Sequence, residues 1–205
     1  AKAAELLDAF LTTHSDPAEN VYMPFALYDR ADCHYNLDQP EAALEVIARI
    51  VRDFPNTVVI DQAYLLRGNI EESLKKYERA EKAYNTAYQN AVKLYHEGIA
   101  SEALFSLIMM LSTPELGRLK DAVPFVDKFW EKHADGSPYR ARIAMGQFPA
   151  LAAVDRAEDG LKRLREIIAE TASSEDTSEL ETLISVYTDA YLTKHTAEEL
   201  KTHFY

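Results

Sequence analysis

Apolar residues recur three and four positions apart along almost the whole chain. The clearest example, in residues 42–54, consists of Ala43, Leu44, Ile47, Ile50, Val51 and Phe54. Residues 80–95 repeat this spacing with alanine and tyrosine. Because an α-helix turns once every 3.6 residues, such a spacing places the apolar side chains on one helical face. The pattern therefore predicts an all-α protein built from amphipathic helices.

Proline positions help to set the boundaries of these helices. Pro40, Pro114 and Pro138 each stand where the first residue of a helix is expected, because proline needs no backbone N–H donor there. Together the signals predict about eleven helices, at residues 1–13, 22–36, 40–53, 58–73, 76–95, 97–112, 115–132, 138–154, 157–171, 178–193 and 197–205. No linker rich in glycine, serine or proline divides the chain, so residues 1–205 are expected to form a single domain.

Charge and composition narrow the classes of partner. The 205 residues carry a formal net charge of -12, and an acidic chain repels the phosphate backbone of nucleic acids. A basic or neutral protein is the partner that this charge favours. The longest apolar run, residues 103–111, is much shorter than the roughly 20 residues that span a bilayer. The lone Cys33 excludes an internal disulfide and a multi-cysteine zinc site.

Two segments of the chain are similar to each other. Residues 24–57 form a 34-residue unit that aligns with residues 61–94. The aligned pairs are Ala26/Ala63, Arg30/Arg67, Ala31/Gly68, Leu37/Leu74, Glu41/Glu78 and Ala43/Ala80. This internal repetition predicts a stack of similar helix pairs.

These residues resemble the tetratricopeptide repeat. That family places small residues at repeat positions 8 and 20, where the two helices of a hairpin touch, and apolar residues at positions 24 and 27. The first unit has Ala31, Ala43, Ile47, Ile50 and, at the family's proline position, Pro55; the second has Gly68, Ala80, Tyr84 and Ala87, with Val92 in place of proline. The resemblance implies a superhelical stack of antiparallel helix hairpins, an αα-solenoid.

The resemblance continues more weakly on both sides of these two units. Residues 1–13 look like the second helix of a preceding repeat, and residues 95–205 look like degenerate repeats in which Pro149 interrupts a first helix. The chain is therefore expected to be a fragment of a longer array. The turn at residues 53–57 is similar to repeats of bacterial cell-envelope proteins, such as outer-membrane assembly lipoproteins and the Tol–Pal coordinator. That similarity implies the periplasm or cell envelope, with the cytoplasm left open.

In this family the first helices line a concave face that binds protein or peptide partners. The corresponding residues in this chain are Phe25, Tyr28, Asp32, Tyr35, Asn36, Gln62, Leu65, Asn69, Glu72 and Ser73. Aromatic residues at helical spacing also occur in cores, so Tyr28 and Tyr35 have the alternative role of packing against neighbouring helices. The positions that hold basic residues in carboxylate-clamp repeats are occupied by Phe25, Asp29, Gln62 and Leu66, so no such clamp is expected.

Candidate catalytic and metal sites are weak. His14, Ser15 and Asp16 are sequence neighbours, whereas a catalytic triad needs side chains that converge from separate elements. Glu199 and His203 could share one metal ion but lie at the end of the chain. The paired carboxylates Glu71 and Glu72 are expected on a solvated face. We therefore predict no catalytic residues, no metal site and no cofactor.

Three functions remain from the sequence. The favoured one is a non-catalytic scaffold that binds a protein or peptide on its concave face. The second is structural self-assembly, as a homo-oligomer, because uncapped repeats expose apolar surfaces. The third is an accessory repeat domain of a larger protein whose activity lies outside this chain.

Overall fold

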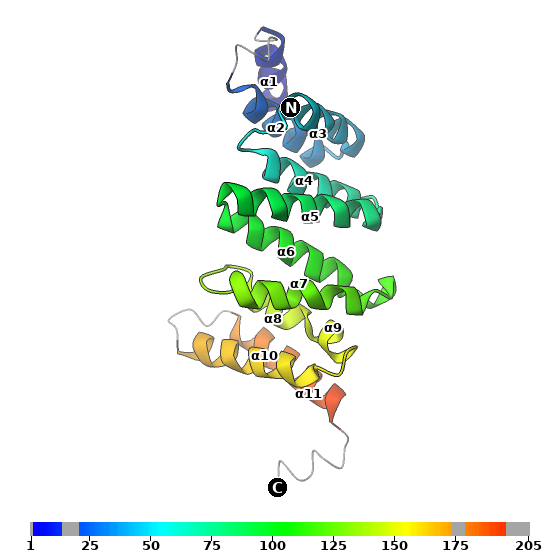
Figure 1. Ribbon diagram of the computed structural model, residues 1–205, viewed down its shortest axis with the longest axis vertical. Helices are drawn as coiled ribbons and strands as arrows, with labels where there is room; N and C mark the ends of the chain where they lie inside the picture. Colours follow the sequence, from blue (N-terminus) through cyan, green and yellow to red (C-terminus); the bar gives the residue numbers. More distant parts are fainter. Residues whose placement is uncertain (1, 14–20, 174–178, 196–205) are drawn as a thin grey trace. The chain divides into compact units, whose positions relative to one another are not determined.

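The computed structural model describes residues 2–13, 21–173 and 179–195 and divides the chain into two compact units, residues 1–103 and 104–205. Every element in the described ranges is a helix. Unit 1 contains α1 (Lys2–Thr13), α2 (Met23–Asn36), α3 (Pro40–Asp53), α4 (Ile60–Ser73) and α5 (Tyr77–Leu94). The helix α6 (Glu97–Leu111) spans the boundary between the units. Unit 2 continues with η1 (Pro114–Leu116), α7 (Leu119–Lys132), α8 (Arg140–Gly146), α9 (Phe148–Ala152), α10 (Ala157–Ala172) and α11 (Leu180–Lys194). Figure 1 labels the α-helices.

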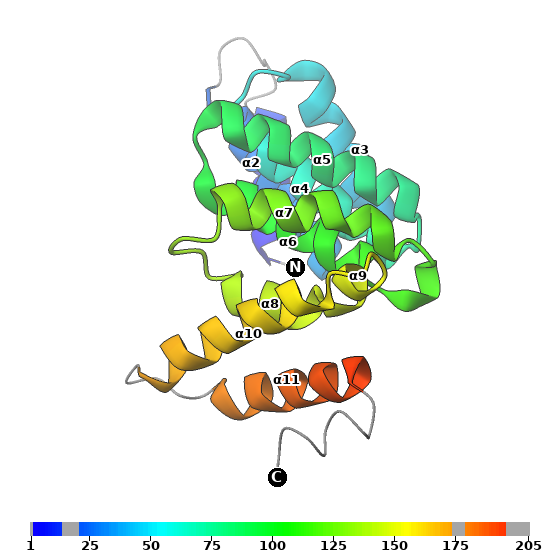
Figure 2. The ribbon, with the colours of Figure 1, turned by 60° about the horizontal axis from the view of Figure 1, so that its bottom comes forward.

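The prediction of an all-α fold made of consecutive helix pairs is confirmed. In unit 1, α2 packs against α3 and α4 against α5, and the first helices α2 and α4 also touch each other. In unit 2, α10 packs against α8, α9 and α11, and Figure 2 shows α10 and α11 lying side by side. None of the described helices has both the length and the apolar character required to cross a membrane.

Two prolines behave differently from each other. Pro149 interrupts a first helix as predicted, because α8 ends at Gly146 and α9 begins at Phe148. The prediction that Pro138 starts a helix is wrong: it lies in a turn, and α8 begins at Arg140. The expected helix at residues 197–205 lies outside the described part of the chain.

Small residues allow the paired helices to approach closely. In the first hairpin, Ala31 of α2 and Ala43 of α3 are both fully buried and belong to the same core cluster. In the second hairpin, a Cβ atom on Gly68 would lie 2.3 Å from two ring carbons of Tyr84. Only glycine leaves room for this ring, and the small-residue positions predicted from the repeat are therefore confirmed.

Four helices end in the same turn. After α2, α4, α5 and α9 comes a residue in the left-handed conformation, namely Asp38, Lys75, Tyr95 and Asp155, with φ between 57° and 61°. In the first of these turns Asp38 N–H donates to Tyr35 C=O and Gln39 N–H donates to His34 C=O, and the other three repeat this pair of bonds at the same spacing. This is the Schellman motif, which satisfies the last carbonyl groups of a helix and usually contains glycine. The shared turn identifies residues 140–172 as a hairpin built like those of unit 1.

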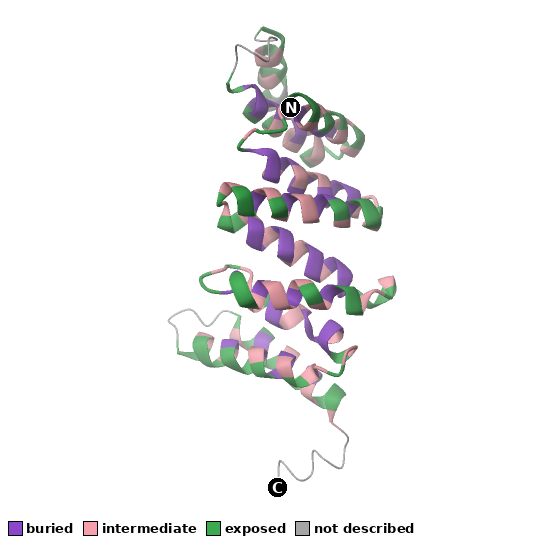
Figure 3. Ribbon diagram, viewed as in Figure 1, coloured by how far each residue is buried: buried purple, intermediate pink, exposed green. Residues whose placement is uncertain are grey.

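Each unit has its own hydrophobic core. In unit 1 the core residues come from α2, α3 and α4 and include Leu27, Ile47, Ile50 and Ile70. In unit 2 a cluster around Phe148, Leu161 and Leu164 joins α9, α10 and α11. Figure 3 shows the buried residues concentrated along the first helices, with exposed residues on the second helices. The outward surface of the first helices is consequently limited to a few side chains, which are described next.

Candidate partner-binding surface

The ten residues predicted for partner binding lie on the first helices α2 and α4 of unit 1. Phe25, Asn36 and Ser73 are exposed, whereas Leu65 is buried and offers little surface. The six half-buried members are Tyr28, Asp32, Tyr35, Gln62, Asn69 and Glu72. Tyr28 and Tyr35 also pack against the core cluster of unit 1, so both tyrosines have a structural role in addition to any contact with a partner.

Several of the polar side chains are held by neighbours. The Asn36 amide donates to the backbone C=O and to Oδ2 of Asp32, at 2.9 and 3.0 Å. The Tyr84 hydroxyl of α5 lies 2.9 Å from Asn69 Oδ1 and 2.6 Å from Glu72 Oε2. These bonds join α4 to α5, so Asn69 and Glu72 contribute to closing the hairpin. A hydrogen bond to a carboxylate is worth about 1.5–3 kcal/mol, more than one between neutral groups.

The negative charges of several carboxylates act on the hydroxyl of Tyr28. Burial raises the pKa of this phenol, and the negative charges of Asp32, Glu102, Asp29 and Asp61 raise it further. These groups belong to three first helices, because Asp61 lies on α4 and Glu102 lies in the part of α6 that belongs to unit 1. The pKa of Asp29 is raised as well, by partial burial and by the charge of Asp32. The first-helix surface of unit 1 is therefore negatively charged around an aromatic ring.

At the base of this surface lies a buried carboxylate. Asp61 is fully buried; its Oδ1 accepts the Gln62 backbone N–H at 2.9 Å, and its Oδ2 lies 2.7 Å from His96 Nδ1. His96 follows the left-handed Tyr95 at the end of α5. The pair connects α4 to the turn between α5 and α6. It gives the buried carboxylate a side-chain hydrogen-bond partner and ties the N-terminal end of α4 to that turn.

The sequence did not single out Glu102 or His96. The connection between α6 and α7 is longer and contains the 3-10 helix at Pro114–Leu116, so the repeat register could not be carried onto α6. The sequence signal that could have indicated acidic first helices was the presence of Asp61 and Glu97 in the first turns of α4 and α6. A second expectation is wrong: Glu71 is buried instead of solvated, with Arg67 and Lys76 at 4.0 and 3.9 Å from its carboxylate.

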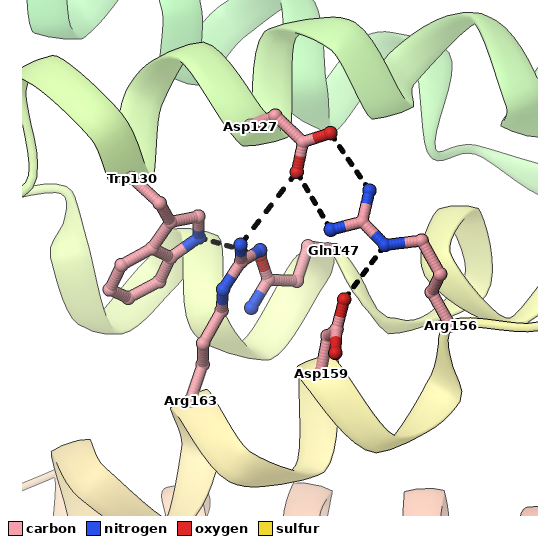
Figure 4. Close-up of polar contacts among 6 residues, drawn as sticks. All are labelled: Asp127, Trp130, Gln147, Arg156, Asp159 and Arg163. Atoms are coloured by element: carbon pink, nitrogen blue, oxygen red, sulfur yellow. Dashed lines mark hydrogen bonds and ion pairs between the residues drawn. The ribbon is translucent and has the colours of Figure 1, made fainter.

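Unit 2 contains a polar network between the second helices α7 and α10. Arg156 donates two hydrogen bonds to Asp127, at 2.8 and 2.9 Å, and a third to Asp159 at 2.7 Å (Figure 4). The hydrogen bonds from Arg156 lower the pKa of Asp127, and burial lowers the pKa of Arg163. Arg163 also lies within 3.7 Å of Asp127. Asp127 of α7 is thus paired with two arginines at the start of and within α10, which is typical of a structural contact.

A buried amide extends this network to the broken first helix. Gln147, at the break between α8 and α9, is fully buried, and its Oε1 accepts the Trp130 indole N–H at 2.7 Å and an Arg163 N–H at 3.1 Å. The guanidinium groups of Arg140 and Arg163 lie 5.8 and 5.0 Å from the centre of the Trp130 ring. The network thereby holds the interrupted helix between α7 and α10.

Two hollows lie beside these elements. In unit 1, a groove of about 420 Å³ over α2, between α1 and α3, is lined by Asp8, Leu11, Thr12, Leu27, Arg30, His34, Glu45, Val46 and Arg49. Its charges are mixed, and Arg30 pairs with Asp8 at 2.7 Å. In unit 2, a cavity of about 340 Å³ is lined by Phe148, Ala152, Asp155, Ala157, Glu158, Thr193 and Lys194. The Lys194 ammonium group donates to Glu158 at its rim and lowers the pKa of that carboxyl.

The residues considered for catalysis or metal binding lie partly within and partly outside the described residues. No group of three or more His, Cys, Asp and Glu side chains within them could hold a metal ion. Cys33 is a free, half-buried thiol, and the Nδ1 atom of the adjacent His34 lies 2.7 Å from Gln39 Oε1. The segment with His14, Ser15 and Asp16 and the pair Glu199 and His203 lie outside the described residues.

Comparison with known proteins agrees with the hairpin geometry. The family model described as the tetratricopeptide repeat matches residues 25–57, which comprise α2, α3 and the turn that follows. No curated protein sequence matches the chain. The matched segment contains the small residues Ala31 and Ala43 that bring α2 and α3 together. By this match and by the pairing of α2 with α3, residues 25–57 are similar to the tetratricopeptide repeat, and the consecutive helix pairs of the rest of the chain are consistent with a helical-repeat fold.

Proposed function

We propose that this protein is a non-catalytic scaffold whose first-helix surface in unit 1 binds a segment of a protein partner. The observation that supports this most directly is the set of side chains around Tyr28. Tyr28, an aromatic residue with a polar tip, lies on α2 with the exposed Phe25, and the accessible carboxylates Asp32, Glu102 and Asp29 act on its hydroxyl. Aromatic side chains provide rigid apolar contact area, and the carboxylates favour a segment that carries lysine or arginine.

Site-specific photo-crosslinking in the source organism tests this proposal. A photoreactive residue at Phe25 or Ser73 would lie on the first-helix surface, and both positions are exposed and contribute little to the core. The same residue at Ala48 of α3 or Gln89 of α5 is a matched control on exposed second-helix positions. We expect Phe25 and Ser73 to give an adduct with the same partner protein and the two control positions to give none.

Charge reversal then identifies the chemistry of recognition. The double substitution Asp32→Lys/Glu102→Lys should abolish the adducts, because it replaces attraction for a basic segment by repulsion. Glu41→Lys/Glu78→Lys makes the same change in net charge at exposed positions on α3 and α5 and should leave the adducts intact. Equal crosslinking from all four positions would refute the surface assignment, and an adduct with a second copy of the chain would instead indicate self-assembly.

A further inference from the structure

The first helices of unit 2 differ from those of unit 1 in charge. Residues 103–114 and residues 136–154, which include the α6 segment of unit 2 together with α8 and α9, contain no aspartate or glutamate. They contain two basic residues, Arg140 and Arg142. In a chain with 34 acidic and 22 basic side chains, such a segment is a local region of positive charge.

Among the residues that the structure describes, Arg142 is the arginine of unit 2 that forms no ion pair with a carboxylate. The other five, Arg118, Arg140, Arg156, Arg163 and Arg165, each form an ion pair with an aspartate or glutamate. No described carboxylate lies within ion-pair distance of Arg142, whose side chain is exposed. Its charge is therefore available to a group outside this chain.

The Arg142 side chain is held in place by stacking. Its guanidinium carbon lies 4.3 Å from the centre of the Phe105 ring, and Phe105 stacks on Tyr139 with ring centres 4.9 Å apart. A guanidinium that stacks by its face keeps the N–H donors at its edge, and these donors match the two oxygens of a carboxylate. Stacking also restricts the long side chain before a ligand arrives, which reduces the entropy lost on binding.

Apolar surface lies beside the stacked arginine. Phe105, Met109 and Tyr139 are each half-buried, so part of every side chain remains accessible. α6 and α8 approach closely here, because a Cβ atom on Gly146 would lie 2.4 Å from the sulfur of Met109. A flexible methionine next to aromatic rings adapts to apolar side chains of different shapes. The surface formed by Phe105, Met109, Tyr139 and Arg142 is here called the α6–α8 surface.

We propose that the α6–α8 surface binds a protein segment in which an aspartate or glutamate side chain stands next to an apolar residue. The carboxylate receives two hydrogen bonds from the edge of Arg142, and the apolar neighbour lies against Phe105 and Met109. The surface is separate from the one proposed for unit 1 and selects the opposite charge. A nucleic-acid phosphate is disfavoured because the chain as a whole is strongly acidic.

Peptide display with the full chain tests this assignment. A library of random peptides is selected on the wild-type protein and counter-selected on Arg142→Glu. Enriched peptides are synthesised with an amidated C-terminus, and their affinities are measured by fluorescence anisotropy. We expect acidic residues adjacent to leucine, isoleucine or phenylalanine, and an affinity loss of about 10- to 100-fold in Arg142→Glu, as for a charge-assisted hydrogen bond.

Control variants separate this surface from nonspecific attraction. Lys120→Glu makes the same charge change at an exposed position near the start of α7 and should leave the affinity unchanged. Phe105→Leu and Arg142→Lys should each weaken binding, since one removes the stacking platform and the other removes the planar donors.

Four outcomes overturn the proposal. The first is enrichment of peptides without acidic residues, and the second is unchanged affinity in Arg142→Glu. The third is a requirement for a free C-terminal carboxylate, which would mean that the surface recognises chain ends. The fourth is binding that responds to Asp32→Lys/Glu102→Lys but not to Arg142→Glu, which would place the peptide on unit 1.

Discussion

Substituting Gly68 with alanine tests the packing of the second hairpin. The new methyl group would lie 2.3 Å from Cδ1 and Cε1 of Tyr84, whereas carbon atoms in ordinary contact are about 3.5–4.0 Å apart. The ring would have to retreat by more than about 1 Å. Tyr84 is almost completely buried, and its hydroxyl is held by Asn69 and Glu72, so this movement would break contacts on both sides of the ring.

The expected loss follows from three contributions. Overpacking of a well-filled core costs about 1–3 kcal/mol. Loss of the hydrogen bond between Tyr84 and the Glu72 carboxylate costs a further ~1.5–3 kcal/mol. Alanine is a better helix former than glycine by about 1 kcal/mol, which offsets part of this loss. We expect the free energy of unfolding of Gly68→Ala to fall by about 1.5–5 kcal/mol.

Urea denaturation followed by far-ultraviolet circular dichroism measures this change. Gly98→Ala in α6 is the control, because no atom lies within 4 Å of a Cβ added there, and it should be neutral or slightly stabilising. In a Tyr84→Leu background the penalty of Gly68→Ala should shrink, because the ring that obstructs the methyl group is gone. The reasoning fails if Gly68→Ala is as stable as the wild type, or if its penalty is the same in both backgrounds.

Two further predictions concern a turn and an ion pair. Lys75 has a φ of 58°, a left-handed conformation that glycine adopts more easily, so Lys75→Gly should raise the free energy of unfolding by about 0.5–1 kcal/mol. Lys76 has a φ of -90°, so Lys76→Gly should lower the free energy of unfolding. The midpoints of urea denaturation compare the two variants. Arg156 lowers the pKa of Asp127, so this pair stabilises the fold above about pH 4 and loses its effect as the pH falls through the lower native pKa. Asp127 is 44% exposed, which limits the effect to below about 1 kcal/mol, and Asp127→Asn should show a smaller loss of stability between neutral pH and about pH 3. An equal loss in wild type and Asp127→Asn would contradict this assignment.

The sequence was sufficient for features that depend on local periodicity and residue size. The apolar spacing predicted nearly every helix, and the small residues at Ala31, Ala43, Gly68 and Ala80 located the hairpin contacts. Pro149 predicted the break between α8 and α9, because a proline within a helix cannot donate its backbone hydrogen bond. These signals act over a few residues and need no knowledge of tertiary structure.

Features that depend on distant contacts were not predictable in this way. Glu71 resembles any exposed glutamate in the sequence, yet the fold buries it. The stacking of Arg142 on Phe105 joins residues 37 positions apart across a connection of irregular length. The left-handed turn residues also lacked a signal, because aspartate, lysine and tyrosine occupy positions where glycine is usual. The candidate surface in unit 1 came from the family resemblance, whereas the α6–α8 surface became visible only with the side chains in place.

Trp130 makes the packing of unit 2 accessible to spectroscopy. It is the single tryptophan of the chain, so its emission can be excited selectively against a background of 12 tyrosines. Its indole N–H is bonded to the buried Gln147, and two guanidinium groups lie near its ring. Opening of α7 from α10 would admit water to the indole and shift its emission to longer wavelength. The protein thus carries an intrinsic optical reporter at the contact between these helices, and ligand binding or local opening near it can be followed without an attached dye.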